Sequence, residues 1–186
     1  RIEEGHMDSK YFRLLTPPGT RWKFHFSETA NRDAVPHVGA QGFPGAERWG
    51  DIDVPRSWET AGHGQAIYTN FVYPFKCDPP HIPADINHVG SYQTEISIPG
   101  EWRGRRVFLQ FEGVSAAFYV WLDGNFVGYS QDSFLPAEFE LTSRLHSTSN
   151  TTSLAPSKHV LSIRVLRYCD GSYMESQDMW WLSGIQ

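Results

Sequence analysis

The sequence is poor in the features that mark several large classes of protein. Its 186 residues hold only two cysteines, Cys77 and Cys169, too few for the disulfide framework of a small secreted domain. Basic residues do not exceed acidic ones: 16 Lys and Arg against 21 Asp and Glu give a net charge of −5, so a nucleic-acid partner is not expected. No apolar run approaches the roughly 18 residues of a membrane span, so no membrane partner is expected either. Free thiols favour a reducing compartment, and we expect a cytoplasmic protein.

The N-terminal residues are expected to lie outside the folded domain. Residues 1–12 are interpreted as a tail, because Gly5-His6-Met7 is typical of a cloning scar and nothing near it has the apolar core of a signal peptide. Residues 13–186 are predicted to form one domain. A chain of this length buries roughly 70% of its unfolded surface and needs no disulfide to fold.

Aromatic residues and alternating patterns are abundant. Aromatic side chains make up 15% of the chain, and they favour both β-strands and surfaces on which sugars stack. The strongest hairpin signal is Asp123-Gly124-Asn125. About eight short strands with Pro-rich connections, some apolar on both faces, predict an all-β fold, an antiparallel jelly-roll β-sandwich. The alternating runs are 21–27, 67–75, 92–98, 107–112, 117–122, 126–129 and 160–168, with a short one at 139–141. Residues 143–157 are interpreted as a Ser/Thr-rich insertion between two strands.

The C-terminal stretch is unusual for a loop, because it combines acidic and aromatic residues. Carboxylates and amides bind sugar hydroxyls, and aromatic rings cover the C–H faces of a pyranose. Asn70, at a strand edge, is a plausible partner because its amide both donates and accepts hydrogen bonds. A structural interpretation stays open, with the tryptophans in the core and Asp170 forming an Asp-Gly turn. The residues in question are Asp170, Tyr173, Glu175, Asp178, Trp180 and Trp181.

Other chemistry finds little support in the sequence. There is no phosphate-binding glycine loop, no H-E-x-x-H motif and no Cys/His spacing typical of zinc. The eight histidines are scattered, so loop or surface positions account for them. A glycosidase needs two carboxylates across the scissile bond. Nothing in the sequence marks one of Asp170, Glu175 and Asp178 as acid and another as nucleophile.

Five spaced motifs, taken together, resemble the N-terminal sugar-binding domain of glycoside hydrolase family 2 β-galactosidases. The resemblance covers about Gly19 to Gln186 and implies a galactose-binding-domain-like jelly roll. It also implies that an immunoglobulin-like domain and a TIM barrel follow in the parent enzyme. The motifs are P-x-x-W at 55–58, I-Y-T-N-x-x-Y-P at 67–74, G-Y-S-Q-D-S-x-L-P-A-E-F at 128–139, D-G-S-Y-x-E-x-Q-D-M-W at 170–180 and S-G-I at 183–185.

The resemblance assigns roles to two residues. Asp170 matches the family aspartate that binds galactosyl hydroxyls and helps to hold a sodium ion, and Asn70 matches the asparagine that contacts the same sugar. The implied activity of the parent, a homo-oligomer, is retaining hydrolysis of terminal β-D-galactosyl residues, as in lactose. Its catalytic glutamates and magnesium belong to the barrel. The chain alone is therefore expected to have no catalytic residues and no activity.

Two other functions remain as alternatives. A free-standing carbohydrate-binding module would bind galactose or lactose without hydrolysing it. A purely structural or interaction domain would dock a neighbour through its apolar stretch Met179–Leu182. Measured affinity of the chain for galactose distinguishes the first alternative from a fragment of an enzyme.

Overall fold

The computed structural model describes residues 9–70, 72–146, 155–175 and 179–186. Gly5-His6-Met7, Asp178 and most of the predicted insertion lie outside the described residues. Of residues 143–157, positions 143–146 belong to helix α1 (Thr142–His146), and Ser157 begins strand β11. Helix α2 (Ser172–Glu175) is the second short helix. Neither helix, nor any other in the described part of the chain, is long and apolar enough to cross a membrane.

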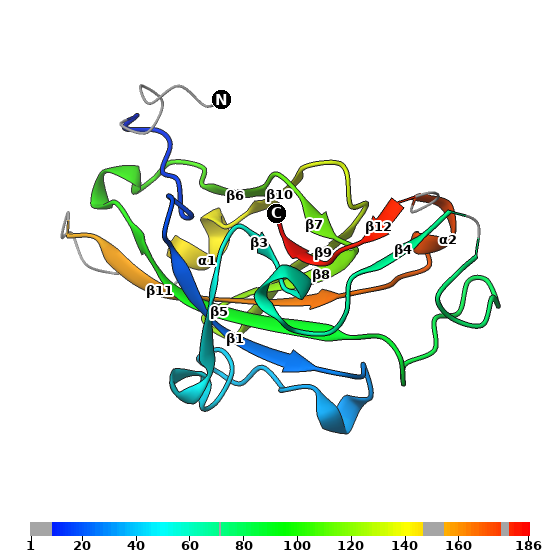
Figure 1. The fold of residues 1–186 in the computed structure, drawn as a ribbon. Helices are drawn as coiled ribbons and strands as arrows, with labels where there is room; N and C mark the ends of the chain where they lie inside the picture. The colour runs from blue at the N-terminus through cyan, green and yellow to red at the C-terminus, as the bar shows by residue number, and fades with distance from the viewer. Residues whose placement is uncertain (1–8, 71, 147–154, 176–178) are drawn as a thin grey trace.

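The predicted all-β sandwich is confirmed, and every strand pairing is antiparallel. One layer is a six-stranded sheet in the order β2-β1-β5-β11-β8-β9. The other layer consists of three short sheets, which lie above the large one in Figure 1. The large sheet contains β1 (Arg21–Ser27), β2 (Gly50–Asp53), β5 (Val89–Ile98), β8 (Ala117–Leu122), β9 (Asn125–Gln131) and β11 (Ser157–Leu166). The short sheets pair β10 (Ala137–Glu140) with β6 (Phe108–Phe111), β12 (Met179–Trp181) with β4 (Ile67–Thr69), and β13 (Gly184–Ile185) with both β3 (Arg56–Ser57) and β7 (Val114–Ser115).

Alternation predicts the long strands well. The run 21–27 coincides with β1, and its Trp22 and Phe24 are buried as the pattern requires. The predicted hairpin joins β8 to β9, and Asp123 and Gly124 both have the positive φ that a tight type I′ turn needs. The run 67–75 is shorter than predicted, because β4 ends at Thr69 and a Pro-containing loop follows.

The main core lies between the two layers and contains the fully buried Trp58 and Tyr92. A second, smaller core consists of Phe75, Tyr168 and Trp181. It lies beside the β4–β12 pair, because Trp181 belongs to β12. This small core supports the part of the molecule in which the sequence places its candidate site.

The prediction that the histidines occupy loop or surface positions is wrong for His159. This residue is buried in β11, and its Nδ1 lies 2.7 Å from Oδ2 of Asp123. Its Nε2 lies 2.9 Å from Oγ of Ser157. The other oxygen of Asp123 accepts the Val160 N–H at 2.8 Å, so the carboxylate fastens the β8–β9 turn to β11.

Candidate functional site

The two residues singled out by the sequence flank the same two-stranded sheet. Asn70 directly follows β4, and β4 pairs with β12 through the partners Thr69 and Met179. Asp170 lies between β11 and α2, and the chain continues from α2 toward β12. In Figure 1 these elements lie together at one end of the sandwich. Both Asn70 and Asp170 are exposed, so neither side chain is enclosed in the core.

Asp170 begins a tight turn that leaves part of its carboxylate available. Its Oδ1 accepts the Gly171 N–H at 3.0 Å, and its backbone carbonyl accepts the Tyr173 N–H at 3.2 Å. The Ser172 hydroxyl accepts the Cys169 N–H at 3.0 Å. Among the described residues, Oδ2 of Asp170 has no hydrogen-bond partner. The turn-forming role is therefore real, and it leaves one carboxylate oxygen free to bind a ligand.

The other candidate carboxylates and rings behave differently from Asp170. Glu175 is engaged inside the chain: its Oε2 accepts the Ser133 N–H at 3.0 Å and its Oε1 accepts the Ser133 hydroxyl at 3.1 Å. Trp181 is a core residue whose indole N–H donates to Oγ1 of Thr69 at 3.2 Å. Asp178 lies outside the described residues, and so does the side chain of Trp180.

Hydrogen bonds attach Tyr173 to the loop of residues 73–81. Its hydroxyl donates to the His81 carbonyl at 2.7 Å and accepts the Asp78 N–H at 3.1 Å. Its own carbonyl accepts the hydroxyl of Tyr73 at 2.7 Å. These bonds attach α2 to the loop of residues 73–81, so Tyr173 acts as a structural residue of the site.

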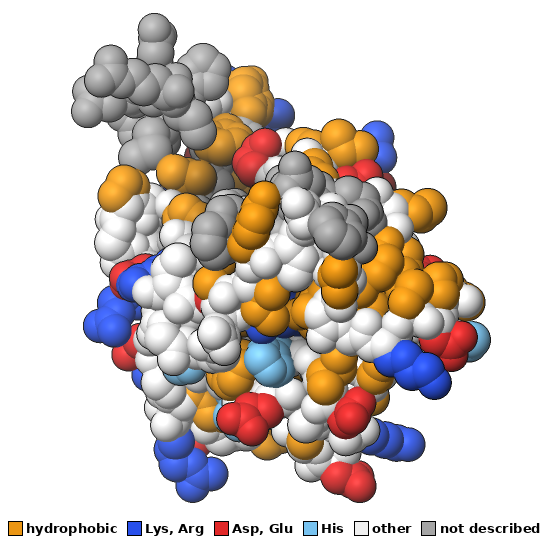
Figure 2. Space-filling model, turned by 45° about the vertical axis from the view of Figure 1, so that its right-hand side comes forward, with side chains coloured by type: hydrophobic (Ala, Val, Ile, Leu, Met, Phe, Trp, Pro, Cys, Tyr) orange, Lys and Arg blue, Asp and Glu red, His pale blue; other side chains and the backbone are white. Residues whose placement is uncertain are grey.

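The segments that carry the two polar candidates also carry exposed apolar side chains. Tyr68, two positions before Asn70, is 53% exposed, and Met174, within α2, is 80% exposed. Figure 2 shows hydrophobic side chains gathered on the face that carries this end of the molecule. An exposed ring beside carboxylate and amide groups is the composition of a sugar-binding surface. The sequence analysis missed Tyr68 as a candidate, although its place in the alternating run indicates an outward face.

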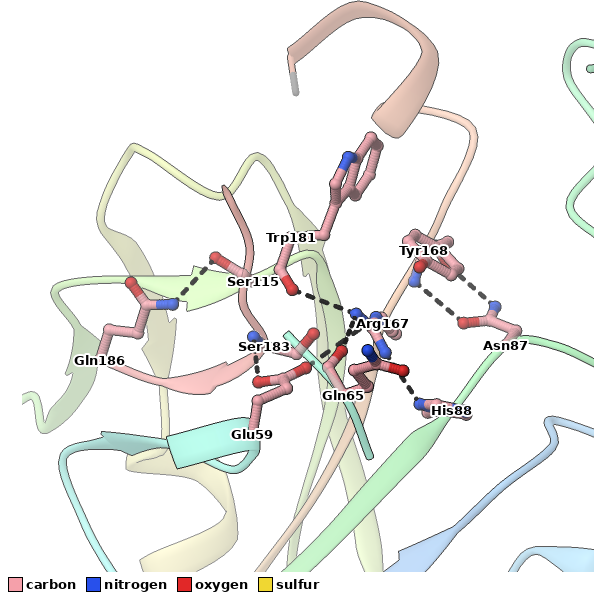
Figure 3. A network of polar contacts seen from close by, with 10 residues as sticks. All are labelled: Glu59, Gln65, Asn87, His88, Ser115, Arg167, Tyr168, Trp181, Ser183 and Gln186. Atoms are coloured by element: carbon pink, nitrogen blue, oxygen red, sulfur yellow. Dashed lines mark hydrogen bonds and ion pairs between the residues drawn. The ribbon is translucent and has the colours of Figure 1, made fainter. Parts of the chain in front are cut away.

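A buried polar network lies beneath this surface (Figure 3). The Arg167 guanidinium donates to the carbonyls of Gln65 at 2.7 Å and Trp181 at 3.1 Å, and to Nδ1 of His88 at 3.0 Å. Its Nε lies 3.9 Å from Oε1 of Glu59, an ion pair longer than a hydrogen bond. The arginine is always charged and only donates, so His88 must accept at Nδ1.

Burial shifts the pKa values of Glu59 and His88, which both face Arg167. Burial raises the pKa of Glu59, although its bond from the Ser183 N–H and the charge of Arg167 act in the opposite direction. Burial, and then the neighbouring charge of Arg167, lower the pKa of His88. His88 therefore stays neutral over a wider pH range than a free histidine, which suits its role as an acceptor.

Asn87 makes a second buried connection. Its amide nitrogen donates to the Tyr168 carbonyl and its amide oxygen accepts the Tyr168 N–H, both at 2.9 Å. The side chain thus pairs with the backbone as a neighbouring strand would. The sequence analysis missed Asn87, Glu59 and Arg167. The position of Arg167 at the end of an apolar strand run was the available signal, since a charge there needs buried partners.

Both cysteines are free, as predicted, but they differ in burial. Cys77 is exposed and Cys169 is buried. Burial raises the pKa of the Cys169 thiol.

A groove of about 1340 Å³ lies away from this site. One wall is formed by residues between 11 and 20, and another by residues 105–112, which include β6. Trp22, Phe108 and Leu109 are among its lining residues. Neither Asn70 nor Asp170 lines it. The candidate site of Asn70 and Asp170 therefore does not coincide with this groove.

Comparisons with known proteins find relatives of this chain. The model of the "Glycosyl hydrolases family 2, sugar binding domain" matches residues 20–186. β-Galactosidase of Psychromonas ingrahamii is 43% identical over 165 residues, which is 89% of this chain and 15% of that protein. β-Galactosidase of Priestia megaterium is 40% identical over 188 residues, 99% of this chain and 17% of that protein. The chain thus spans about one sixth of the length of these relatives. Among solved structures, β-glucuronidase of Faecalibacterium prausnitzii matches 78% of this chain and 20% of that one, with a TM-score of 0.49 and 18% identity.

Proposed function

The chain belongs to the sugar-binding domain family of the family 2 glycosyl hydrolases, and from this premise we propose that it is part of a β-galactosidase. The complete gene product would hydrolyse terminal non-reducing β-D-galactosyl residues, with lactose as a typical substrate. This chain would supply contacts to the sugar and none of the reacting groups. Curated relatives named β-galactosidase, of which the chain spans about 15–17%, support this assignment.

The exposed carboxylate of Asp170 is the observation that carries the proposal. It is fixed by its own turn, keeps Oδ2 free among the described residues, and lies at the end of the sandwich that also presents Asn70. A carboxylate accepts hydrogen bonds from two sugar hydroxyls, and an amide can both donate and accept. Asn70 directly follows β4, and the chain runs from Asp170 through α2 to β12, the partner of β4, so the proposal has one sugar contact both residues.

The described residues of the C-terminal stretch do not offer a catalytic pair for retaining hydrolysis. Such a mechanism needs two free carboxyl groups about 5–5.5 Å apart. Among the described residues of the C-terminal stretch, Glu175 is engaged with Ser133 and only Asp170 keeps a free oxygen. The proposal therefore places the acid/base and nucleophile outside this chain, together with any magnesium ion, and predicts that the 186 residues alone do not hydrolyse galactosides.

Asp170 also suits a shared cation site. A carboxylate oxygen is a hard ligand, appropriate for an alkali cation such as sodium. No group of three or more His, Cys, Asp or Glu side chains in the described part of the chain could hold a metal. In this proposal Asp170 is one ligand of a set, and the remaining ligands come from other parts of the complete protein.

The test is Asp170→Asn in the complete gene product. The substitution keeps the size of the side chain and removes its charge. Because a hydrogen bond to a charged group contributes about 1.5–3 kcal/mol, we expect kcat/KM for a chromogenic β-galactoside to fall about tenfold or more. Asp33→Asn is the matched control, since Asp33 is an exposed carboxylate of the 3₁₀ turn Arg32–Ala34. Equal activity of the two variants would contradict the proposal.

Titration of the isolated chain separates the alternative function. We expect weak binding of galactose, in the millimolar range at best, because a pocket with few polar contacts gives little affinity. NMR titration of the 186-residue chain measures it. Sub-millimolar binding without hydrolysis by the complete product would favour a carbohydrate-binding module instead.

A further inference from the structure

We propose that Asn87 and Arg167 are positioning residues, which hold the segments bearing Asp170 and Asn70 in the geometry that binds the sugar. The inference rests on the proposed function of the same site. Neither residue touches the sugar in this proposal, because both are buried, with exposures of 5% for Asn87 and 3% for Arg167. Their effect passes through the backbone on which the two exposed side chains stand.

Asn87 fixes the backbone immediately before the Asp170 turn. Both polar atoms of its side chain bond to Tyr168, two residues ahead of Asp170. Asn87 itself lies just before β5, a central strand of the large sheet. The turn is therefore attached to a strand with neighbours on both sides, since β5 pairs along its length with β11 and over residues 89–93 with β1.

Arg167 connects three chain segments through one planar group. It precedes Tyr168, and it donates to the carbonyls of Gln65 and Trp181. Gln65 leads into β4 and hence to Asn70, while Trp181 belongs to β12, the partner of β4. The guanidinium fork has fixed directions, so it holds the segment before β4, which leads to Asn70, in place relative to the segment that begins the Asp170 turn.

Further contacts hold the far side of the turn. Glu175, at the end of α2, is bonded to Ser133, and Tyr173 is bonded to the loop of residues 73–81. With both sides attached, the backbone at Asp170 is held in place. A binding group that is already in place loses less conformational entropy when it meets its ligand, which increases affinity without a new contact.

The alternative is that these bonds serve stability alone, and Gln93 provides the matched control. Its side-chain amide oxygen likewise joins buried backbone to the sheet, accepting the Phe43 N–H at 2.6 Å and the Ser162 hydroxyl at 3.0 Å. The loop it holds does not carry Asp170 or Asn70. Asn87→Leu and Gln93→Leu therefore remove comparable bonds, and only the first should change sugar binding.

The experiment compares both variants in the complete gene product. We expect Asn87→Leu to lower kcat/KM for a chromogenic β-galactoside, and to weaken inhibition by galactose, by about tenfold or more, as misplacement of one charged contact would. Gln93→Leu should leave both unchanged, although both variants lower the unfolding temperature. Arg167→Lys keeps the positive charge beside Glu59 but loses the planar guanidinium, so it should lower kcat/KM and weaken galactose inhibition as Asn87→Leu does. It replaces Asn87→Leu in the experiment if that variant does not fold.

Non-additivity provides a readout that a purely structural role would not give. If Asn87 acts through Asp170, the double variant Asn87→Leu/Asp170→Asn should be little worse than Asp170→Asn alone. Suppose that Asp170→Asn impairs the enzyme as expected. Fully additive effects in the double variant would then overturn the inference, and so would unchanged galactose inhibition in both Asn87→Leu and Arg167→Lys. An unimpaired Asp170→Asn variant would instead show that the proposed function is wrong.

Discussion

Arg167 shows how one buried charge can be accommodated in a small β-sandwich. A buried guanidinium is costly unless its donors are bonded and its charge is balanced. Two backbone carbonyls, a neutral His88 and the nearby Glu59 meet most of that need. The Nε atom of Arg167 has no hydrogen bond in the described part of the chain. It lies 3.9 Å from Oε1 of Glu59, close enough for an ion pair but too far for a hydrogen bond.

His88 gives this network a predictable dependence on pH. The pKa of His88 is lowered by burial and by Arg167, from an ordinary value of 6.5. Below pH 6.5 the unfolded chain takes up a proton that the folded chain resists, so the free energy of unfolding decreases as the pH falls. We expect a His88→Gln variant, which keeps an acceptor and cannot titrate, to lose less stability between about pH 7 and pH 5. Urea unfolding at several pH values measures the difference, and parallel curves would contradict it.

At the scale of elements, the two-residue strand β13 depends on a glycine. Gly184 has φ +120°, and a Cβ there would lie 2.9 Å from the Arg56 carbonyl oxygen and 3.0 Å from the Tyr92 hydroxyl. Neither contact is relieved easily, because Arg56 belongs to β3, which pairs with β13, and Tyr92 is fully buried in the main core. The backbone conformation and the contact both exclude larger residues.

Gly184→Ala is therefore expected to destabilise the chain by about 1–3 kcal/mol, the cost of a side chain in such a conformation. Gly50→Ala is the control, because Gly50 has an ordinary φ and open space around its Cα. It should leave stability unchanged or raise it slightly. Urea unfolding compares the two variants, and an equal effect of both would show that β13 does not constrain Gly184.

The elements that the sequence predicts best are those with local signals. β1 and the β8–β9 hairpin follow from alternation and from Asp123-Gly124. The strands β3, β7 and β13 are too short for a periodic pattern, and α2 has only four residues. These elements exist because distant segments pack against them. Tertiary context also sets the length of β4. This strand is shorter than its alternating run predicts, since its pairing with β12 covers only three residues.

At the scale of the whole molecule, the site could be predicted only in part. Residue chemistry and spacing indicated Asp170 and Asn70 as sugar-binding candidates, and the resemblance to a family gave them roles. Their common location depends on pairing between residues 67–69 and 179–181, more than 100 positions apart in the chain. Local patterns do not encode such a pairing, so the buried supports Asn87 and Arg167 were not found from the sequence.

The folded chain as a whole should also make its two thiols unequal. Cys77 is exposed, whereas Cys169 is buried and its pKa is raised by burial, which reduces the reactive thiolate. We expect a maleimide to modify Cys77 alone in the native 186-residue chain, and both cysteines in urea. Intact-mass measurement counts the adducts, and a doubly modified native chain would contradict the buried position of Cys169.

This difference makes Cys77 a natural attachment point for a spectroscopic probe. The residue precedes Asp78, whose N–H bonds to the hydroxyl of Tyr173 in α2. A fluorophore coupled at position 77 would stand close to the sugar-binding candidates without any engineered cysteine. Changes in its emission during titration would then report occupancy of the neighbouring surface in real time.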